Sequence, residues 1–106
     1  SYNRSYITLA ISLMNKIDLY KNKSFDSKNL YLTNIEYEKA ERAFEKIIKS
    51  SKIPDGKLEH LKKKTIEGNN IILSFLEKDL DNYNEKYRND ALRDLKQLLS
   101  IYDKLY

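Results

Sequence analysis

Apolar side chains recur every three or four residues along almost the whole chain, which is the spacing of one face of an α-helix. A β-strand would instead alternate apolar and polar residues at every second position. Only one proline and two glycines interrupt these patterns in 106 residues. The sequence therefore predicts an all-α protein, with a first helix over about 3–22. The stripe of that helix is carried by Tyr6, Ala10, Leu13, Ile17 and Tyr20.

A capping pattern marks where the second and the last helices begin. Thr33 and Glu36 have the spacing of a capping box, in which each side chain accepts a hydrogen bond from the backbone N–H of the other residue. They predict a second helix over about 33–51. Asn82 and the glutamate three residues later have the same spacing, and with the apolar stripe that follows they predict a last helix over about 83–106.

The stretch KIPDGKLEHLKK, residues 52–63, contains the only proline and the only histidine of the chain. Pro54 cannot continue a preceding helix, because its ring fixes φ and leaves no backbone N–H to donate. Asp55 can cap a following helix through its carboxylate. We therefore predict a corner here between antiparallel helices, with the third helix over about 55–80.

Four helices with short connections predict one domain over residues 1–106, folded as an antiparallel up-and-down bundle. A chain of this length buries enough surface for one core without disulfides. The sequence Gly68-Asn69-Asn70 disfavours a helix by roughly 2 kcal/mol relative to alanine, so a break that leaves five shorter helices is the alternative. We predict a continuous third helix, because Gly68 lies on its apolar stripe, where a small residue permits close approach of a neighbour.

Cysteine and histidine, which serve as nucleophiles, bases and metal ligands in many sites, are nearly absent from this chain. It has no cysteine, and its single histidine, His60, has no partner at the spacing that a zinc or di-iron site on one helix needs. Asp79 and Asp81 begin like a calcium loop, but the glycine and the closing glutamate of that loop are missing. The chain also lacks a glycine-rich phosphate loop. We therefore expect a protein that is not an enzyme and that needs no metal or cofactor.

The net positive charge of the chain is concentrated around the predicted corner. Residues 46–64 carry seven lysines against two carboxylates, a net charge of +5, whereas the rest carries thirteen basic and fourteen acidic residues. Such a patch suits an anionic polymer such as nucleic acid, acidic lipid or phosphate-rich cell wall, and a solubilising charged end is the alternative. The predicted patch consists of Lys46, Lys49, Lys52, Lys57, Lys62, Lys63 and Lys64.

The second helix also carries several carboxylates. Glu38 and Arg42 are four residues apart, as are Glu45 and Lys49, and oppositely charged residues at this spacing can pair on an exposed helix surface. We therefore interpret these carboxylates as part of a solvated face.

Nine tyrosines are many for a chain of this length. Five of them lie on the predicted core stripes, where the ring is buried and the hydroxyl reaches the rim. The other four are Tyr2, Tyr31, Tyr83 and Tyr106. An exposed face shared by two or three of these would indicate a protein partner.

Three pieces of the chain follow one another in the order seen in a known family. They are YITLAISLMNKIDLY at 6–20, IPDGKLEHL at 53–61 and NDALRDLKQLLSIYDKLY at 89–106. With a tyrosine-led first helix and a proline-led helix with a histidine soon after, the chain resembles small helical extracytoplasmic lipoproteins of low-GC Gram-positive bacteria. The resemblance implies a cell-surface binding or accessory domain, whose partner is another protein or an anionic envelope component. It also implies an export signal before Ser1, with a cysteine for lipid attachment.

Two other classes of protein remain open. The first is an intracellular interaction protein, such as a bacteriocin-immunity, phage or plasmid accessory protein, since these are often lysine-rich helical bundles of this size. The second is a weak nucleic-acid binder that uses the basic corner, although the predicted patch has no arginine and no interleaved aromatic residues. No apolar run approaches the roughly 20 residues that a membrane span requires, so we expect no transmembrane helix.

Overall fold

Three α-helices and a shorter helical segment make up the described part of the chain. The computed structural model describes residues 4–26, 30–54, 56–64, 67 and 85–105. The helices are α1, Arg4–Asp26; α2, Asn34–Ser50; and α4, Glu85–Leu105. Residues 56–64 are also helical, as is residue 67. The described residues contain no strand, which confirms the predicted all-α class.

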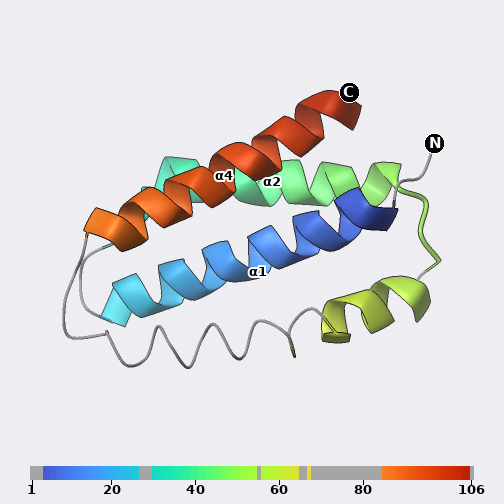
Figure 1. Ribbon diagram of the computed structural model, residues 1–106, viewed down its shortest axis with the longest axis horizontal. Coiled ribbons are helices and arrows are strands. Elements are labelled where there is room, and N and C mark those ends of the chain that lie inside the picture. The colour runs from blue at the N-terminus through green and yellow to red at the C-terminus, as the bar shows by residue number, and fades with distance from the viewer. Residues whose placement is uncertain (1–3, 27–29, 55, 65–66, 68–84, 106) are drawn as a thin grey trace.

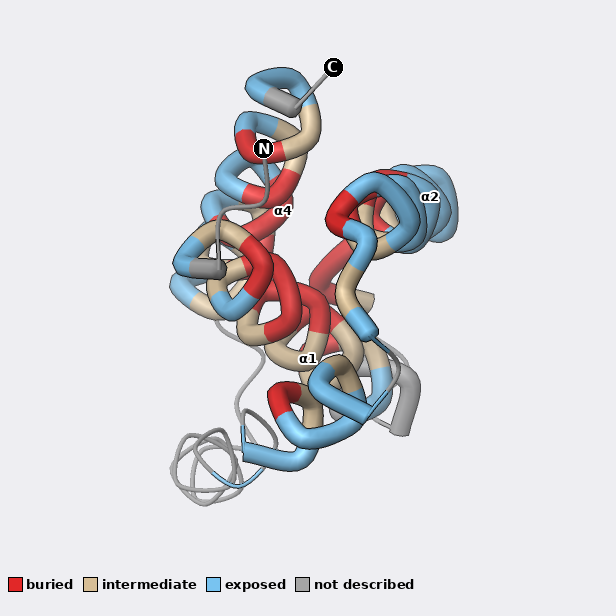
Figure 2. The backbone as a smooth tube through the Cα atoms, turned by 90° about the vertical axis from the view of Figure 1, so that its right-hand side faces the viewer, coloured by how far each residue is buried: buried red, intermediate tan, exposed pale blue. Residues whose placement is uncertain are grey.

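The helices alternate in direction along the chain, as in an up-and-down bundle (Figure 1). α2 runs antiparallel to α1, segment 56–64 runs antiparallel to α2, and α4 runs in the same direction as α2 (Figure 1). α1, α2 and α4 each pack against the other two. Segment 56–64 lies beside α1, on the side away from α4 (Figures 1 and 2). The predicted antiparallel four-helix bundle is confirmed, and its parallel helices α2 and α4 contact each other directly.

The predicted helix boundaries agree with the structure to within a few residues. α1 continues to Asp26, beyond its predicted end at 22, α2 begins one residue later than predicted, and α4 is described from Glu85. The helical residues 56–64 lie inside the third predicted helix. Residues 68–70, where that helix was expected to be continuous, and the predicted cap at Asn82 lie outside the described residues.

The start of α2 has the predicted capping box. Thr33 Oγ1 accepts a hydrogen bond from the backbone N–H of Glu36 at 3.2 Å, and Glu36 Oε2 accepts one from the backbone N–H of Thr33 at 2.6 Å. These two bonds satisfy backbone donors that the first turn of a helix otherwise leaves without a partner. The local sequence therefore determines where α2 begins.

The corner after α2 is built by the backbone of Lys52 and Pro54. Lys52 has a φ of 53°, in the left-handed region that follows many helix ends. The carbonyl oxygen of Pro54 then accepts hydrogen bonds from the backbone N–H groups of Lys57 and Leu58, at 2.9 and 3.1 Å. Pro54 therefore separates α2 from the next helical segment, as predicted, while the expected cap Asp55 lies outside the described residues.

We expect Lys52→Gly to stabilise the protein by about 0.5–1 kcal/mol. A residue with a Cβ costs roughly 1–2 kcal/mol in the left-handed region, and the greater freedom of glycine in the unfolded chain offsets part of the gain. Urea unfolding followed by circular dichroism measures the change. The same substitution at Lys49, inside α2, is the matched control and should destabilise by about 0.5 kcal/mol or more. A loss of stability at position 52 would contradict its left-handed conformation.

The core lies between α1 and the elements packed around it, with buried residues turned inward (Figure 2). α1 has a wider buried face than its predicted stripe, because Ile7, Ile11 and Met14 are buried as well. It has this wide face because α2 and α4 pack on it and segment 56–64 lies along a further side. The other buried apolar residues are Tyr31, Leu32, Ala40, Ala43, Ile47, Leu61, Ala91, Leu95, Leu98 and Ile101.

Tyr31 belongs to the core, although it lies on none of the predicted core stripes. Its side chain is only 6% exposed. Its ring lies edge-on to that of Tyr20, with centroids 6.2 Å apart, and 5.8 Å from that of Tyr87. The connection between α1 and α2 thus closes one end of the bundle with aromatic contacts, which a helical stripe does not reveal. Tyr2, Tyr83 and Tyr106 lie outside the described residues.

A search of the described helices for a stretch long and apolar enough to cross a membrane finds none.

Candidate binding surfaces

The most buried charge in the described part of the chain joins α4 to α1. The Asp94 side chain is 4% exposed, and its Oδ2 lies 3.0 Å from Lys16 Nζ, which donates a hydrogen bond to Oδ1 at 3.3 Å. Burial, and then the negative charge of Asp94, raise the pKa of the nearby Tyr20 hydroxyl, which therefore stays protonated. Sequence reasoning missed this pair, although Asp94 lies between Ala91 and Leu98 on a core-facing stripe. Its role is to connect two helices.

A second polar contact joins α1 to α2. Tyr37 Oη donates a short hydrogen bond of 2.5 Å to Asp18 Oδ1. Burial raises the pKa of Asp18, although the hydrogen bond from Tyr37 acts in the opposite direction. Burial, and then the hydrogen bond to Asp18, raise the pKa of Tyr37. The hydrogen bond between Tyr37 and Asp18 therefore connects α2 to α1.

This raised pKa predicts how Asp18→Asn responds to pH. Because folded Asp18 holds its proton more tightly than the unfolded chain does, its contribution to stability is present at low pH and is lost as pH rises through its folded pKa. Asparagine keeps an acceptor for Tyr37 but does not ionise. Relative to wild type, the variant should therefore become more stable as pH rises above about 4, as measured by urea unfolding at each pH. A difference that is constant with pH would contradict the shift.

Arg88 links α4 to the start of α2. Its guanidinium donates a hydrogen bond to the carbonyl oxygen of Tyr31 at 2.6 Å and lies 3.6 Å from Glu36 Oε1. Glu36 therefore serves both the capping box and this contact. In the described part of the chain, no group of three or more acidic, histidine or cysteine side chains lies close enough to hold a metal ion.

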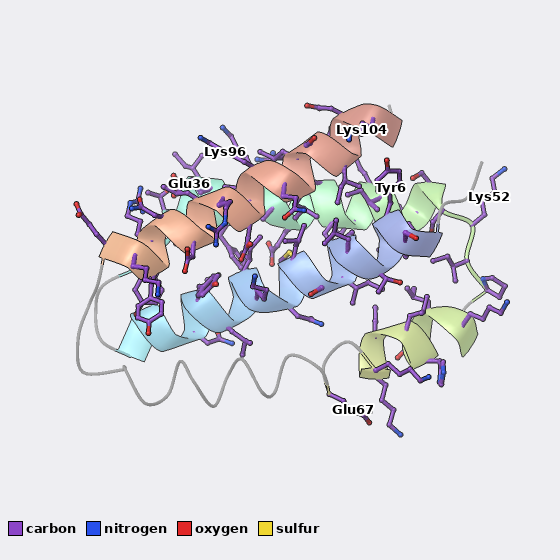
Figure 3. The ribbon with its side chains drawn as sticks, in the orientation of Figure 1. Tyr6, Glu36, Lys52, Glu67, Lys96 and Lys104 are labelled. Carbon is purple, nitrogen blue, oxygen red and sulfur yellow. The ribbon has the colours of Figure 1, made fainter. Side chains whose placement is uncertain are left out.

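The seven predicted patch lysines all lie at the surface, but on different elements. Lys46 and Lys49 lie on α2, and Lys52 extends beyond the end of the bundle (Figure 3). The other four are on segment 56–64, namely Lys57, Lys62, Lys63 and Lys64. Lys62 is half-buried and lies 3.9 Å from Glu59, and His60 on the same segment is exposed.

These lysines divide into two basic surfaces. Lys46 is directed at α4, where its Nζ donates a hydrogen bond to Tyr102 Oη at 3.3 Å and lies 5.4 Å from the centroid of that ring. Segment 56–64 lies on the other side of α1 from α4 (Figures 1 and 2). The lysines of segment 56–64 therefore form one basic surface, and Lys46 contributes to another.

The second surface is a groove between α2 and α4, which we call the α2–α4 groove. It is open, with a volume of about 270 Å³. Its described lining residues are Lys39, Arg42, Ala43, Lys46, Leu99 and Tyr102. Ala43 is buried and Leu99 and Tyr102 are half-buried, while the three cations are exposed. The groove thus combines an apolar floor with a basic rim.

Arg42 and Lys49 of α2 form no ion pair with a carboxylate of the same helix in the described part of the chain. The expected pairs Glu38–Arg42 and Glu45–Lys49 are not among the ion pairs that the described residues form within 4.0 Å. Lys39 also forms no ion pair there. The positive charges of Lys39 and Arg42 beside the groove are therefore available to a partner.

An exposed isoleucine extends this face of α2. Ile35 is 66% exposed and is the one large hydrophobic side chain that is exposed in the described part of the chain. It precedes Lys39 by four residues and Arg42 by seven, so the three lie on one face of the helix. The sequence contained this signal, because the cations at 39, 42, 46 and 49 are spaced by three and four residues.

Comparison with protein-family models, with curated proteins and with solved structures finds no match to this chain.

Proposed function

We propose that this protein is a non-enzymatic binding or accessory domain that acts at a bacterial cell surface through contacts with an acidic protein or an anionic polymer. The observation that supports this is the contrast between inner and outer charges. Asp94 and Asp18 are each bonded to a side chain of another helix. Lys39, Arg42 and Lys49, by contrast, form no ion pair among the described residues. Such cations attract anionic partners.

Binding to a panel of anionic probes tests the proposal. The panel comprises an acidic polypeptide, a teichoic-acid-like polyphosphate, acidic vesicles and duplex DNA, each at about 20 mM and about 300 mM salt. We expect at least one probe to bind at low salt and to dissociate as salt screens the lysines. Absence of binding to all four at low salt would contradict the proposal.

A lysine variant assigns that binding to a surface. Replacing Lys62, Lys63 and Lys64 with glutamine should leave the fold intact, because these residues lie at the surface of segment 56–64 and glutamine has good helix propensity. If that segment is the binding surface, the variant loses most of the binding that wild type shows at low salt. Unchanged binding would show that these three lysines are not part of the binding surface.

The cell-surface part of the proposal depends on the resemblance of residues 6–20, 53–61 and 89–106 to extracytoplasmic lipoproteins. The intracellular alternative predicts the same charge-dependent binding in a different compartment. Fractionation of bacteria that express the gene from its native start codon separates the two. Recovery with the membrane or cell wall supports the surface role, and recovery in the cytoplasm alone supports the intracellular one.

A further inference from the structure

We infer that the α2–α4 groove binds an acidic amphipathic helix of a partner protein. This inference rests on the proposed function, because it names the partner class of the binding domain. It is supported by the cations of the groove, by its apolar floor together with Ile35, and by the arrangement of the two helices that form it.

The rim of the groove matches an acidic partner. Lys39, Arg42 and Lys46 line it, and none of its described lining residues is acidic. Lys49 continues the same row by three residues toward the end of α2. At about 1.5 Å per residue, the row from Lys39 to Lys49 is about 15 Å long, which carboxylates on successive turns of a facing helix can follow.

The apolar residues indicate a partner that is more than a charged polymer. Leu99 and Tyr102 are half-buried in the groove, and Ile35 lies in line with the cations at 66% exposure. Covering such side chains requires aliphatic or aromatic groups on the partner. A phosphate polymer presents charged groups without an apolar stripe, whereas a protein helix can carry an apolar stripe beside an acidic one. Charge and apolar surface together therefore favour a protein.

The arrangement of α2 and α4 suits a helix as the bound element. The two helices run in the same direction and contact each other (Figure 1), and residues of both line the groove between them. A third helix can pack against two such helices with its own apolar stripe inward. The face from Ile35 to Lys49 is about 21 Å long, which corresponds to a helix of about 15 residues.

The test uses a fluorescent peptide of about 15 residues, with leucine every three or four positions and glutamate on both sides of that stripe. A peptide of the same composition, scrambled so that no apolar stripe remains, is the control. At about 20 mM salt, fluorescence anisotropy should show binding of the amphipathic peptide at least about tenfold tighter than that of the scrambled peptide.

Two double variants with the same change in net charge locate the site. Lys39→Gln with Arg42→Gln should weaken binding of the amphipathic peptide about tenfold, and Lys62→Gln with Lys63→Gln less than about twofold. Ile35→Ser should weaken it about threefold or more at both low and high salt, because an apolar contact is not screened. Circular dichroism and urea unfolding confirm that each variant is folded, as expected for residues at the surface.

The outcomes separate this inference from the proposed function. Equal affinity for the two peptides, or equal weakening by the two double variants, overturns the inference. Tighter binding of duplex DNA or acidic vesicles than of the amphipathic peptide also overturns it, but leaves an anionic partner and hence the proposed function standing. If no probe binds at low salt, both fail.

Discussion

Replacing Leu95 with aspartate should remove about 4 kcal/mol or more of stability, which is enough to unfold much of the protein at 25 °C. Leu95 is 5% exposed and belongs to the core that α4 shares with α1 and α2. The substitution deletes its buried apolar contacts and places a carboxylate where the core offers apolar neighbours. Circular dichroism at 222 nm and urea unfolding at neutral pH measure the loss.

Leu95→Met is the matched control for this position. It keeps an apolar side chain of similar volume, so it should cost less than about 1.5 kcal/mol. A folded aspartate variant with nearly wild-type stability would mean that position 95 has access to solvent, and would contradict the packing of α4 in this bundle.

The parts of the fold that depend on local sequence were predictable. The capping box of Thr33 and Glu36 lies within four consecutive residues, and the structure contains both of its hydrogen bonds. Pro54 separates α2 from segment 56–64 for an equally local reason, because proline has no backbone N–H to donate to a preceding helix. Periodicity likewise identified helices, because the 3.6-residue repeat is a property of each segment alone.

How many residues of a helix are buried depends on how many other elements pack against it. The sequence of that helix alone does not contain this information. Ile7, Ile11 and Met14 are buried because elements pack on several sides of α1, whereas a single stripe assumes packing on one side. Tyr31 is buried for a similar reason, since its ring meets Tyr20 and Tyr87 from two other parts of the chain. These positions depend on how the helices assemble.

Counting charge along the chain and counting it around a helix group the lysines differently. The count along the chain placed Lys46 in the patch with Lys62 to Lys64, whereas the structure directs Lys46 toward Tyr102 on α4. Counting charge around α2 instead places Lys39 and Arg42 on the same face as Lys46. The other side of the groove is formed by Leu99 and Tyr102, which lie more than fifty residues away in sequence. The groove could therefore be identified only from the tertiary structure.

The buried pair of Lys16 and Asp94 leads to the second prediction of a large effect. Lys16→Met keeps the length of the side chain but removes the ammonium, so the Asp94 carboxylate, 4% exposed, loses its ion-pair partner. Breaking a buried pair in this way typically costs about 3–5 kcal/mol. We expect about 3 kcal/mol, at the lower limit, because the Lys16 side chain is 23% exposed and solvent screens part of the interaction.

A double variant separates the attraction within this pair from the cost of burying its members. Lys16→Met combined with Asp94→Leu removes both charges and leaves apolar side chains of similar size between α1 and α4. Because the desolvation of a buried pair opposes its Coulomb attraction, the double variant should recover most of the stability that Lys16→Met loses, to within about 1 kcal/mol of wild type. Urea unfolding of the wild type, both single variants and the double variant completes the cycle. If the double variant is as unstable as Lys16→Met, the pair makes a net favourable contribution that hydrophobic packing does not replace.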